Sequence, residues 1–252
     1  MSELLGSLAG RIALVTGAGS GIGRATALRL AADGAAVGCL DRDGDAASAT
    51  AREVEQASGR AVGLTADVTD PVAVATGVTT LVGRFGPVGV LVNNAGVPGA
   101  GLFAEISFED WRRVIDVHVD GAFHVTQAVL PGMLEAGWGR IVNIASESVW
   151  LGNTSVQYAT AKAALLGFTR SLARQVAASG VLVNAVAPGP VETPMLFDNS
   201  AAEIDRERAT VLIGRFLQPE EIAASVAFLV GPGGDAYVGQ VISPNGGTVF
   251  PG

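Results

Sequence analysis

Short apolar segments alternate with longer amphipathic segments along this chain, and the alternation limits the possible folds more than any other feature. Segments that are apolar at successive positions are typical of strands buried on both faces of a parallel sheet. They occur at Ile12–Val15, Ala36–Leu40, Ala61–Leu64, Val88–Val92, Ile141–Ile144, Val181–Ala187 and Gln240–Ser243. The sequence therefore predicts an α/β protein built on a mostly parallel sheet.

Helical patterns fill the intervals between these segments. Asp70 and Pro71 form an N-cap followed by proline at the first helical position, which predicts a helix over 71–85. Pro219 opens a second helix, and an apolar stripe over 157–178 predicts a third. Because strands and helices alternate, we expect a doubly wound, Rossmann-type parallel sheet with helices on both faces.

A single domain over 1–252 is expected, because no linker rich in Pro, Gly or Ser divides the chain. The segment 193–216 interrupts the alternation. It holds three apolar residues, Met195, Leu196 and Phe197, followed by a charged helical stretch. Two interpretations stay open: a surface insertion, or a substrate loop over a site at the carboxyl ends of the strands.

Charge and cysteine content narrow the functional classes. The formal net charge of −8 disfavours a nucleic acid or an anionic membrane as the principal partner. The single cysteine, Cys39, cannot form an internal disulfide and is expected in the core, and no metal site is predicted. No apolar run approaches about 18 residues and the first five residues are not basic, so the expected location is the cytoplasm.

A glycine-rich turn, Thr16–Gly23, follows the first predicted strand and opens a helix. Glycines allow backbone N–H groups to approach a pyrophosphate at a helix N-terminus. Asp41 ends the second predicted strand, where a carboxylate can accept hydrogen bonds from a ribose diol and repel a 2′-phosphate. The turn holds no Lys or Arg, so NAD is predicted over NADP, although Arg42 works against this preference. The residues expected to contact the cofactor here are Gly17, Ser20, Gly21, Ile22 and Gly23.

Tyr158 and Lys162 are four residues apart on a predicted helix, so their side chains share one face. A neighbouring ammonium favours the phenolate form, typically lowering the pKa of a tyrosine by about 1–3 units, which would make Tyr158 a usable general acid–base. The alternative is an ordinary amphipathic surface pair. That alternative is weakened because Lys162 is the only lysine in the chain and Tyr158 is one of two tyrosines.

Polar and small residues also follow other predicted strands, at the edge where an open α/β sheet binds ligands. Together with the glycine-rich turn, the Tyr-x-x-x-Lys pair and Pro188-Gly189 with Thr193, these residues form an ordered set of motifs. In this set the sequence resembles the short-chain dehydrogenase/reductase family over essentially its full length. The residues concerned are Asp67, Val68, Asn93–Gly96 and Ser146.

This resemblance implies a specific role for each site residue. Tyr158 would pass a proton to or from the substrate oxygen, and Ser146 would hold that oxygen by a hydrogen bond. Lys162 would bind the nicotinamide ribose and lower the pKa of Tyr158. Further cofactor contacts are implied for Asp67, Val68, Asn94, Ala95, Gly96, Pro188, Gly189, Val191 and Thr193.

Two positions depart from the family pattern. Eleven residues rather than twelve separate Ser146 from Tyr158, which makes Ser148 a competing hydroxyl and shortens the loop 153–157. His118 stands where the family usually has an asparagine that supports a water linked to the lysine. Either His118 replaces that asparagine in a proton relay and charges near pH 6.5, or it fills space on its helix.

The leading interpretation is an NAD-dependent dehydrogenase or reductase that interconverts a small, largely apolar secondary alcohol and a ketone. Expected pocket residues are Pro98–Leu102, Trp150, Leu151, Met195, Leu196 and Phe197. The runner-up is a reductase or dehydrogenase of 3-oxoacyl or hydroxyacyl groups on acyl carrier protein or CoA. Such enzymes tend to carry basic residues for the acidic carrier, whereas the matching positions here are Ala136, Gly137 and Ser179.

A non-catalytic nucleotide-binding protein is the third interpretation, opposed by the intact Ser146, Tyr158 and Lys162. Assembly is expected as a homotetramer, both from the resemblance and because the chain closes with the apolar, uncharged segment 238–252.

Overall fold

Seven parallel strands form one sheet in the order β3-β2-β1-β4-β5-β6-β7. The computed structural model describes residues 8–99, 101–152, 155–197 and 200–251. The strands are β1 (Ile12–Thr16), β2 (Ala36–Asp41), β3 (Arg60–Thr65), β4 (Val90–Asn93), β5 (Gly139–Ile144), β6 (Val181–Val186) and β7 (Val241–Ile242). Each predicted strand is present, which confirms the doubly wound α/β fold.

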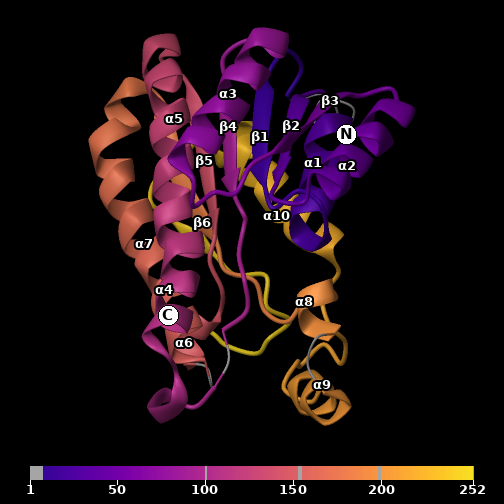
Figure 1. The fold of residues 1–252 in the computed structure, drawn as a ribbon, viewed down its shortest axis with the longest axis vertical. Helices are drawn as coiled ribbons and strands as arrows, with labels where there is room; N and C mark the ends of the chain where they lie inside the picture. The colour runs from indigo at the N-terminus through magenta and orange to yellow at the C-terminus, as the bar shows by residue number, and fades with distance from the viewer. Residues whose placement is uncertain (1–7, 100, 153–154, 198–199, 252) are drawn as a thin grey trace.

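Helices cover both faces of this sheet (Figure 1). The longer ones are α1 (Gly21–Ala32), α2 (Gly44–Gln56), α3 (Pro71–Phe85), α5 (Gly121–Ala136), α7 (Val156–Val176) and α10 (Pro219–Val230). The shorter ones are α4 (Phe108–Ile115), α6 (Ser148–Leu151), α8 (Pro194–Phe197) and α9 (Ala201–Arg208). Short 3₁₀ segments lie at Phe103–Glu105, Ala177–Ser179 and Pro232–Gly234, and a π-helical turn at Asp116–Asp120 joins α4 to α5.

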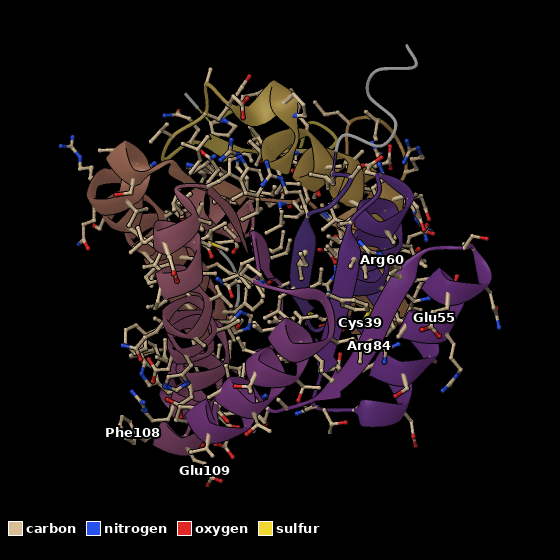
Figure 2. All side chains as sticks on the ribbon, turned by 90° about the horizontal axis from the view of Figure 1, so that it is seen from above. Cys39, Glu55, Arg60, Arg84, Phe108 and Glu109 are labelled. Atoms are coloured by element: carbon tan, nitrogen blue, oxygen red, sulfur yellow. The ribbon has the colours of Figure 1, made fainter. Side chains whose placement is uncertain are left out.

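The sheet separates two apolar cores, one on each face. Leu30 of α1, Val54 of α2 and Ile222 of α10 belong to the first core. The second core contains residues of α3, α5 and α7, such as Val129. Burial on both faces explains why the strands read as continuous apolar runs in the sequence. Cys39 is buried in the first core, as expected, whereas Phe108 and Glu109 lie at the outer edge (Figure 2).

The predicted helix signals are confirmed in detail. The Asp70 carboxylate accepts hydrogen bonds from the N–H groups of Val72 and Ala73, at 2.9 and 3.1 Å, and caps α3. Pro219 occupies the first turn of α10. Three predicted strands extend beyond the observed ones, because β4 begins at Val90, β6 ends at Val186 and β7 keeps only two residues.

The chain changes direction across the sheet between β1 and β4, and a set of hydrogen bonds joins the carboxyl ends of these two strands. The Thr16 hydroxyl accepts from the N–H groups of Asn94 and Ala95, both at 3.0 Å. In return, the Asn94 amide donates to the carbonyl oxygens of Thr16 and Gly17, at 2.9 and 3.2 Å. The glycine-rich turn is thereby held against the end of β4, at the switch point where such sheets bind ligands.

We predict that Gly23→Ala destabilises the protein by about 1–3 kcal/mol, because overpacking a tight contact has that typical cost. A Cβ at this position would lie 2.0 Å from the Gly17 carbonyl oxygen and 2.5 Å from the Asn94 amide nitrogen. Gly83→Ala in α3 is the matched control, since a Cβ there meets nothing within 4 Å. The control should gain up to about 1 kcal/mol from helix propensity. Equal unfolding midpoints in urea for the two variants would contradict the prediction.

Candidate active site

A cleft of about 1120 Å³ lies at the carboxyl ends of the strands. Its walls come from the glycine-rich turn, the segments after β2 to β6, and the helices α8 and α9 below the sheet (Figure 1). The predicted site residues that line it are Gly17, Ser20, Gly21, Ile22, Asp41, Arg42, Asp67, Val68, Asn94, Ala95, Gly96, His118, Ser146, Leu151, Tyr158, Lys162, Pro188, Gly189, Val191, Thr193, Met195 and Leu196. The segment 193–216 therefore contributes to the cleft rather than forming a remote insertion.

Apart from the segment 98–102, three predicted site residues lie outside this lining. Trp150 lines a separate hollow with Arg170 and Arg174, because residues of the short helix α6 point to different sides: Ser148 and Leu151 line the cleft and Trp150 does not. Phe197 ends α8 and is exposed. Gly23 packs beneath the turn, where a side chain would collide with backbone atoms.

The predicted pocket segment 98–102 is also only partly correct. Pro98 and Gly99 line the cleft, whereas Gly101 and Leu102 do not. Position 100, and positions 153–154 of the shortened loop, lie outside the described residues.

The glycine-rich turn has the shape that a dinucleotide pyrophosphate requires. Gly17 and Gly21 adopt positive φ angles of 63° and 50°, a conformation that favours glycine. Ser20 is the N-cap of α1 but its side chain makes no capping hydrogen bond, so N–H groups of the first turn stay available to an anion. A Cβ at Gly19 would lie 2.7 Å from Ala46, so only glycine lets the turn approach α2 this closely. The turn therefore fits the phosphates of a dinucleotide.

Asp41 lies at the same end of the cleft, where the adenosine ribose of such a dinucleotide would be held. Its carboxylate accepts hydrogen bonds from the N–H groups of Gly19, at 2.9 Å, and Asp43, at 3.0 Å. A carboxylate has about four acceptor positions, so two such bonds leave capacity for a ribose diol. Arg42 also lines the cleft, so the one feature that works against NAD is present as well.

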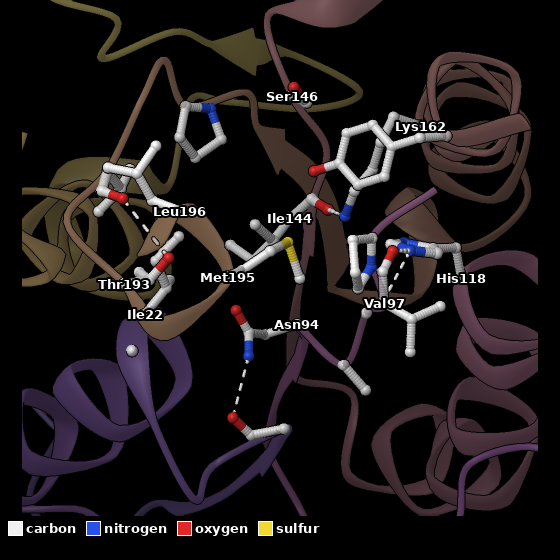
Figure 3. Close-up of a pocket in the computed structure, with 18 of the residues that line it drawn as sticks. Ile22, Asn94, Val97, His118, Ile144, Ser146, Lys162, Thr193, Met195 and Leu196 are labelled. Atoms are coloured by element: carbon white, nitrogen blue, oxygen red, sulfur yellow. Dashed lines mark hydrogen bonds between the residues drawn. The ribbon is translucent and has the colours of Figure 1, made fainter. Parts of the chain in front are cut away.

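Ser146, Tyr158 and Lys162 come together from the end of β5 and from α7. Ser146 and Tyr158 both line the cleft, and the Ser146 hydroxyl acts to lower the pKa of the Tyr158 phenol. The Lys162 amine lies 5.6 Å from the centre of the Tyr158 ring and donates to the Ile144 carbonyl oxygen at 2.6 Å (Figure 3). Ser146, rather than Ser148, therefore faces the tyrosine.

Burial sets the protonation of this pair. Burial raises the pKa of Tyr158 to about 12, against the hydrogen bond from Ser146, which lowers it. Burial also lowers the pKa of Lys162 to about 7. In the cofactor-free protein, burial determines the direction of the Tyr158 pKa shift, and a lowering of this pKa by Lys162 stays a prediction. The amine is itself desolvated and readily loses the proton whose charge would stabilise the phenolate. At neutral pH the phenol is in its proton-donating form.

His118 lies in the π-helical turn between α4 and α5 and is 2% exposed. Its Nε2 lies 2.9 Å from the carbonyl oxygen and 3.0 Å from the nitrogen of Val97. Its ring packs edge-on against Tyr158, with ring centres 5.4 Å apart (Figure 3 shows His118 beside Val97 and Lys162). The buried Nδ1 has no hydrogen-bond partner among the described residues.

The expectation that His118 charges near pH 6.5 is wrong. Burial first, and then the charge of Lys162, lower the pKa of His118 to about 3. A ring that stays neutral from pH 5.5 to 9 cannot add an acidic limb to the activity profile in that range. A role in positioning Tyr158 stays compatible with its contacts.

Sequence reasoning missed a buried amide network that links the strands beneath the site. The Asn93 amide donates to Asn143 at 2.8 Å and to Thr126 at 3.0 Å, and the Asn143 amide donates to Thr169 at 2.9 Å. These bonds tie β4 and β5 to α5 and to α7, the helix that carries Tyr158 and Lys162. Asn143 is polar within an otherwise apolar run, which was the available signal.

Four carboxylates that line the cleft were also missed: Asp43, Glu147, Glu203 and Glu207. Glu147 directly follows Ser146, and this adjacency could have indicated it. Glu203 and Glu207 come from the charged part of the substrate loop and could not be placed without the fold. Among the described residues, no three or more His, Cys, Asp or Glu side chains gather as a metal site.

The chain matches the family model for short chain dehydrogenases over residues 11–204. It is 41% identical to the short-chain reductase protein NovJ of Streptomyces niveus, over 94% of this chain and 93% of that protein. It is 40% identical to a 3-oxoacyl-(acyl-carrier-protein) reductase of Aquifex aeolicus, over 95% and 98%. It is 38% identical to the 2-dehydro-3-deoxy-L-rhamnonate dehydrogenase (NAD(+)) of a Sphingomonas species, over 91% of each.

The chain therefore belongs to the short-chain dehydrogenase family of oxidoreductases, which use a nicotinamide cofactor. Within the described residues, no helix is both long and apolar enough to cross a bilayer.

We predict that Tyr158→Phe lowers kcat about 100-fold or more, because the variant lacks the hydroxyl that transfers the proton. Affinity for the nicotinamide cofactor, measured by calorimetry, should change little. Tyr237→Phe is the matched control, since Tyr237 packs on Phe228 away from the cleft. Near wild-type turnover of the Tyr158 variant would refute the assignment.

A second prediction follows from the buried neutral imidazole. Below about pH 6.5 the unfolded chain protonates His118, whereas the folded protein does so only near pH 3, so acid costs the wild type stability. The unfolding free energy of wild type relative to His118→Asn should fall by up to about 1.4 kcal/mol per pH unit between pH 6 and 4. His124 is present in both proteins and cancels. A difference that stays constant over this range would show that His118 is free to charge in the folded state.

Proposed function

We propose that this protein is an NAD(H)-dependent oxidoreductase that interconverts a secondary alcohol and a ketone in the cytoplasm. The observation that carries the cofactor choice is Asp41 at the mouth of the cleft, beside a turn without Lys or Arg. A carboxylate there accepts hydrogen bonds from a ribose diol and repels a 2′-phosphate. The name of the Sphingomonas relative, an NAD(+) dehydrogenase, supports the same choice.

Tyr158 and Ser146 have different roles at the substrate oxygen: Tyr158 transfers the proton and Ser146 holds the oxygen. When bound, the nicotinamide ring donates or accepts the hydride at the carbinol carbon. In reduction, the Tyr158 phenol gives its proton to the substrate oxygen, and in oxidation the phenolate takes that proton back. The Ser146 hydroxyl donates a hydrogen bond to the same oxygen, which holds the reacting carbon in place.

Lys162 is placed to bind the ribose of the nicotinamide half. Hydroxyl oxygens near the buried amine would favour its ammonium form, since hydrogen bonding to a charged form stabilises it. Loading the cofactor would thus raise the pKa of Lys162 and lower that of Tyr158.

The substrate end of the cleft has apolar walls from Leu151, Met195 and Leu196, which suit a small substrate with an apolar part. We propose a small-molecule alcohol or ketone as the partner, with no role for nucleic acid or membrane. We also propose a homotetramer as the assembly, on the grounds of the family and of the apolar carboxyl-terminal segment.

The second candidate is a 3-oxoacyl reductase that acts on acyl carrier protein or CoA substrates. It is favoured by the names of relatives such as the 3-oxoacyl-(acyl-carrier-protein) reductase of Aquifex aeolicus. It is disfavoured by the acidic chain and by the absence of a basic residue at Ala136, Gly137 and Ser179. Measuring reduction of an acetoacetyl thioester with NADH and NADPH separates the two candidates.

We predict a kcat/KM with NAD(H) at least tenfold above that with NADP(H). Asp41→Ala should lower the ratio of these two kcat/KM values about tenfold. The expected size follows from losing hydrogen bonds to a charged group together with the repulsion of the 2′-phosphate. Asp45→Ala is the control, because Asp45 is exposed on α2 and outside the cleft lining. A wild-type preference for NADPH would contradict the proposal.

A further inference from the structure

Two half-buried carboxylates, Glu147 and Glu207, line the same cleft as the catalytic tyrosine. Glu147 lies between Ser146 and α6, and Glu207 projects from α9. Burial raises the pKa of Glu147 to about 6, and the charge of Glu207 adds to this rise. Burial is also the main cause of the raised pKa of Tyr158, to which the charges of Glu207 and Glu147 add. Carboxylates from two separate elements therefore act on the same small volume in front of the reacting hydroxyl.

No basic side chain neutralises them in the described part of the chain. None of the ion pairs within 4 Å includes Glu147 or Glu207. The arginines on either side of Glu207 are engaged elsewhere. Arg206 donates to the Ala202 carbonyl oxygen, and Arg208 pairs with Asp205 and stacks on the Phe216 ring. Half-buried, unpaired carboxylates are costly to a fold, so their presence in a cleft points to a ligand role.

Glu147 is also held in position. Its N–H donates to the Pro188 carbonyl oxygen at 2.9 Å, and its carboxylate accepts a hydrogen bond from the Thr248 hydroxyl. The carboxyl-terminal turn that carries Thr248 is fixed by Asn245, which accepts from the Gly247 N–H at 2.8 Å. One bond from Thr248 leaves most acceptor positions of the Glu147 carboxylate for a ligand.

We propose that Glu147 and Glu207 determine substrate specificity: they select a secondary alcohol or ketone that carries a second hydrogen-bond donor, a hydroxyl or an ammonium group, beside the reacting carbon. The same pair rejects a substrate with a carboxylate at that place. The inference rests on the proposed function and narrows its substrate class from a largely apolar molecule to one with an apolar part and a donor group. Charge-assisted hydrogen bonds supply the preference, and like-charge repulsion supplies the rejection.

The test compares four alcohols that share a phenyl group and differ only beside the carbinol carbon. They are 1-phenylethanol, 1-phenylethane-1,2-diol, 2-amino-1-phenylethanol and mandelate. We expect kcat/KM for NAD-linked oxidation to be about tenfold higher for the diol and the amino alcohol than for 1-phenylethanol, and lowest for mandelate. The amino alcohol and the diol separate recognition of a positive charge from recognition of a hydroxyl.

Glu147→Gln and Glu207→Gln keep the side-chain shape and remove the charge. In each variant the advantage of the amino alcohol over 1-phenylethanol should shrink by about threefold or more, and mandelate should gain relative to 1-phenylethanol. Ratios between substrates are the readout, because any change in the pKa of Tyr158 affects all four alcohols alike. Glu135→Gln at the exposed end of α5 is the control with the same change in charge and should leave every ratio unaltered.

Binding of the four compounds to the NAD-loaded protein, measured by calorimetry, separates this inference from the proposed function. Turnover without discrimination, or discrimination that survives both glutamine substitutions, overturns the inference and leaves the function standing. Absence of turnover with both cofactors, together with tighter binding of the amino alcohol that is lost in the variants, overturns the function and supports the inference. Equal binding of all four compounds without turnover refutes both.

Discussion

The hydrogen bond from the Lys162 amine to the Ile144 carbonyl oxygen joins α7 to the end of β5 inside the protein. The amine is 4% exposed, so this contact takes the only lysine of the chain out of water. Desolvation then lowers the pKa of Lys162, and burial of the neighbouring phenol raises that of Tyr158. The site depends on this burial, because it fixes the geometry of the pair and keeps the proton on the tyrosine in the free protein.

The sheet makes this burial possible. Parallel strands end at one edge, so the residues after β1, β2, β4, β5 and β6 meet in a single cleft. Thr16 and Asn94 tie the nucleotide half of that cleft together, and the Asn93–Asn143–Thr169 network ties β4 and β5 to the catalytic helix. The polar groups buried beneath the site therefore hold the nucleotide half of the cleft and the catalytic helix in a fixed relative position.

The fold could be predicted because strand burial and helix caps leave local signals, as the apolar runs and Asp70-Pro71 show. Tyr158 and Lys162 could be predicted because their spacing puts both groups on one helix face, and Ser146 because it follows a strand at the ligand-binding edge and matches the family pattern. Their pKa values could not, since burial is a property of the whole fold and is the largest influence on both groups. The predictions that Trp150 and Phe197 line the cleft were wrong for a related reason, because packing sets the direction of each side chain in a short helix. The pairing of Glu147 with Glu207 could not be predicted either, since it depends on α9 folding back below the sheet.

The most direct test uses the fact that Lys162 is the only lysine. Protein labelled with ¹³C at the lysine ε-carbon should give a single side-chain signal, whose chemical shift can be followed against pH in the cofactor-free protein. If burial governs the site, this signal titrates with a pKa of about 7. A titration near 10.4, the ordinary value for an exposed lysine, would contradict the account.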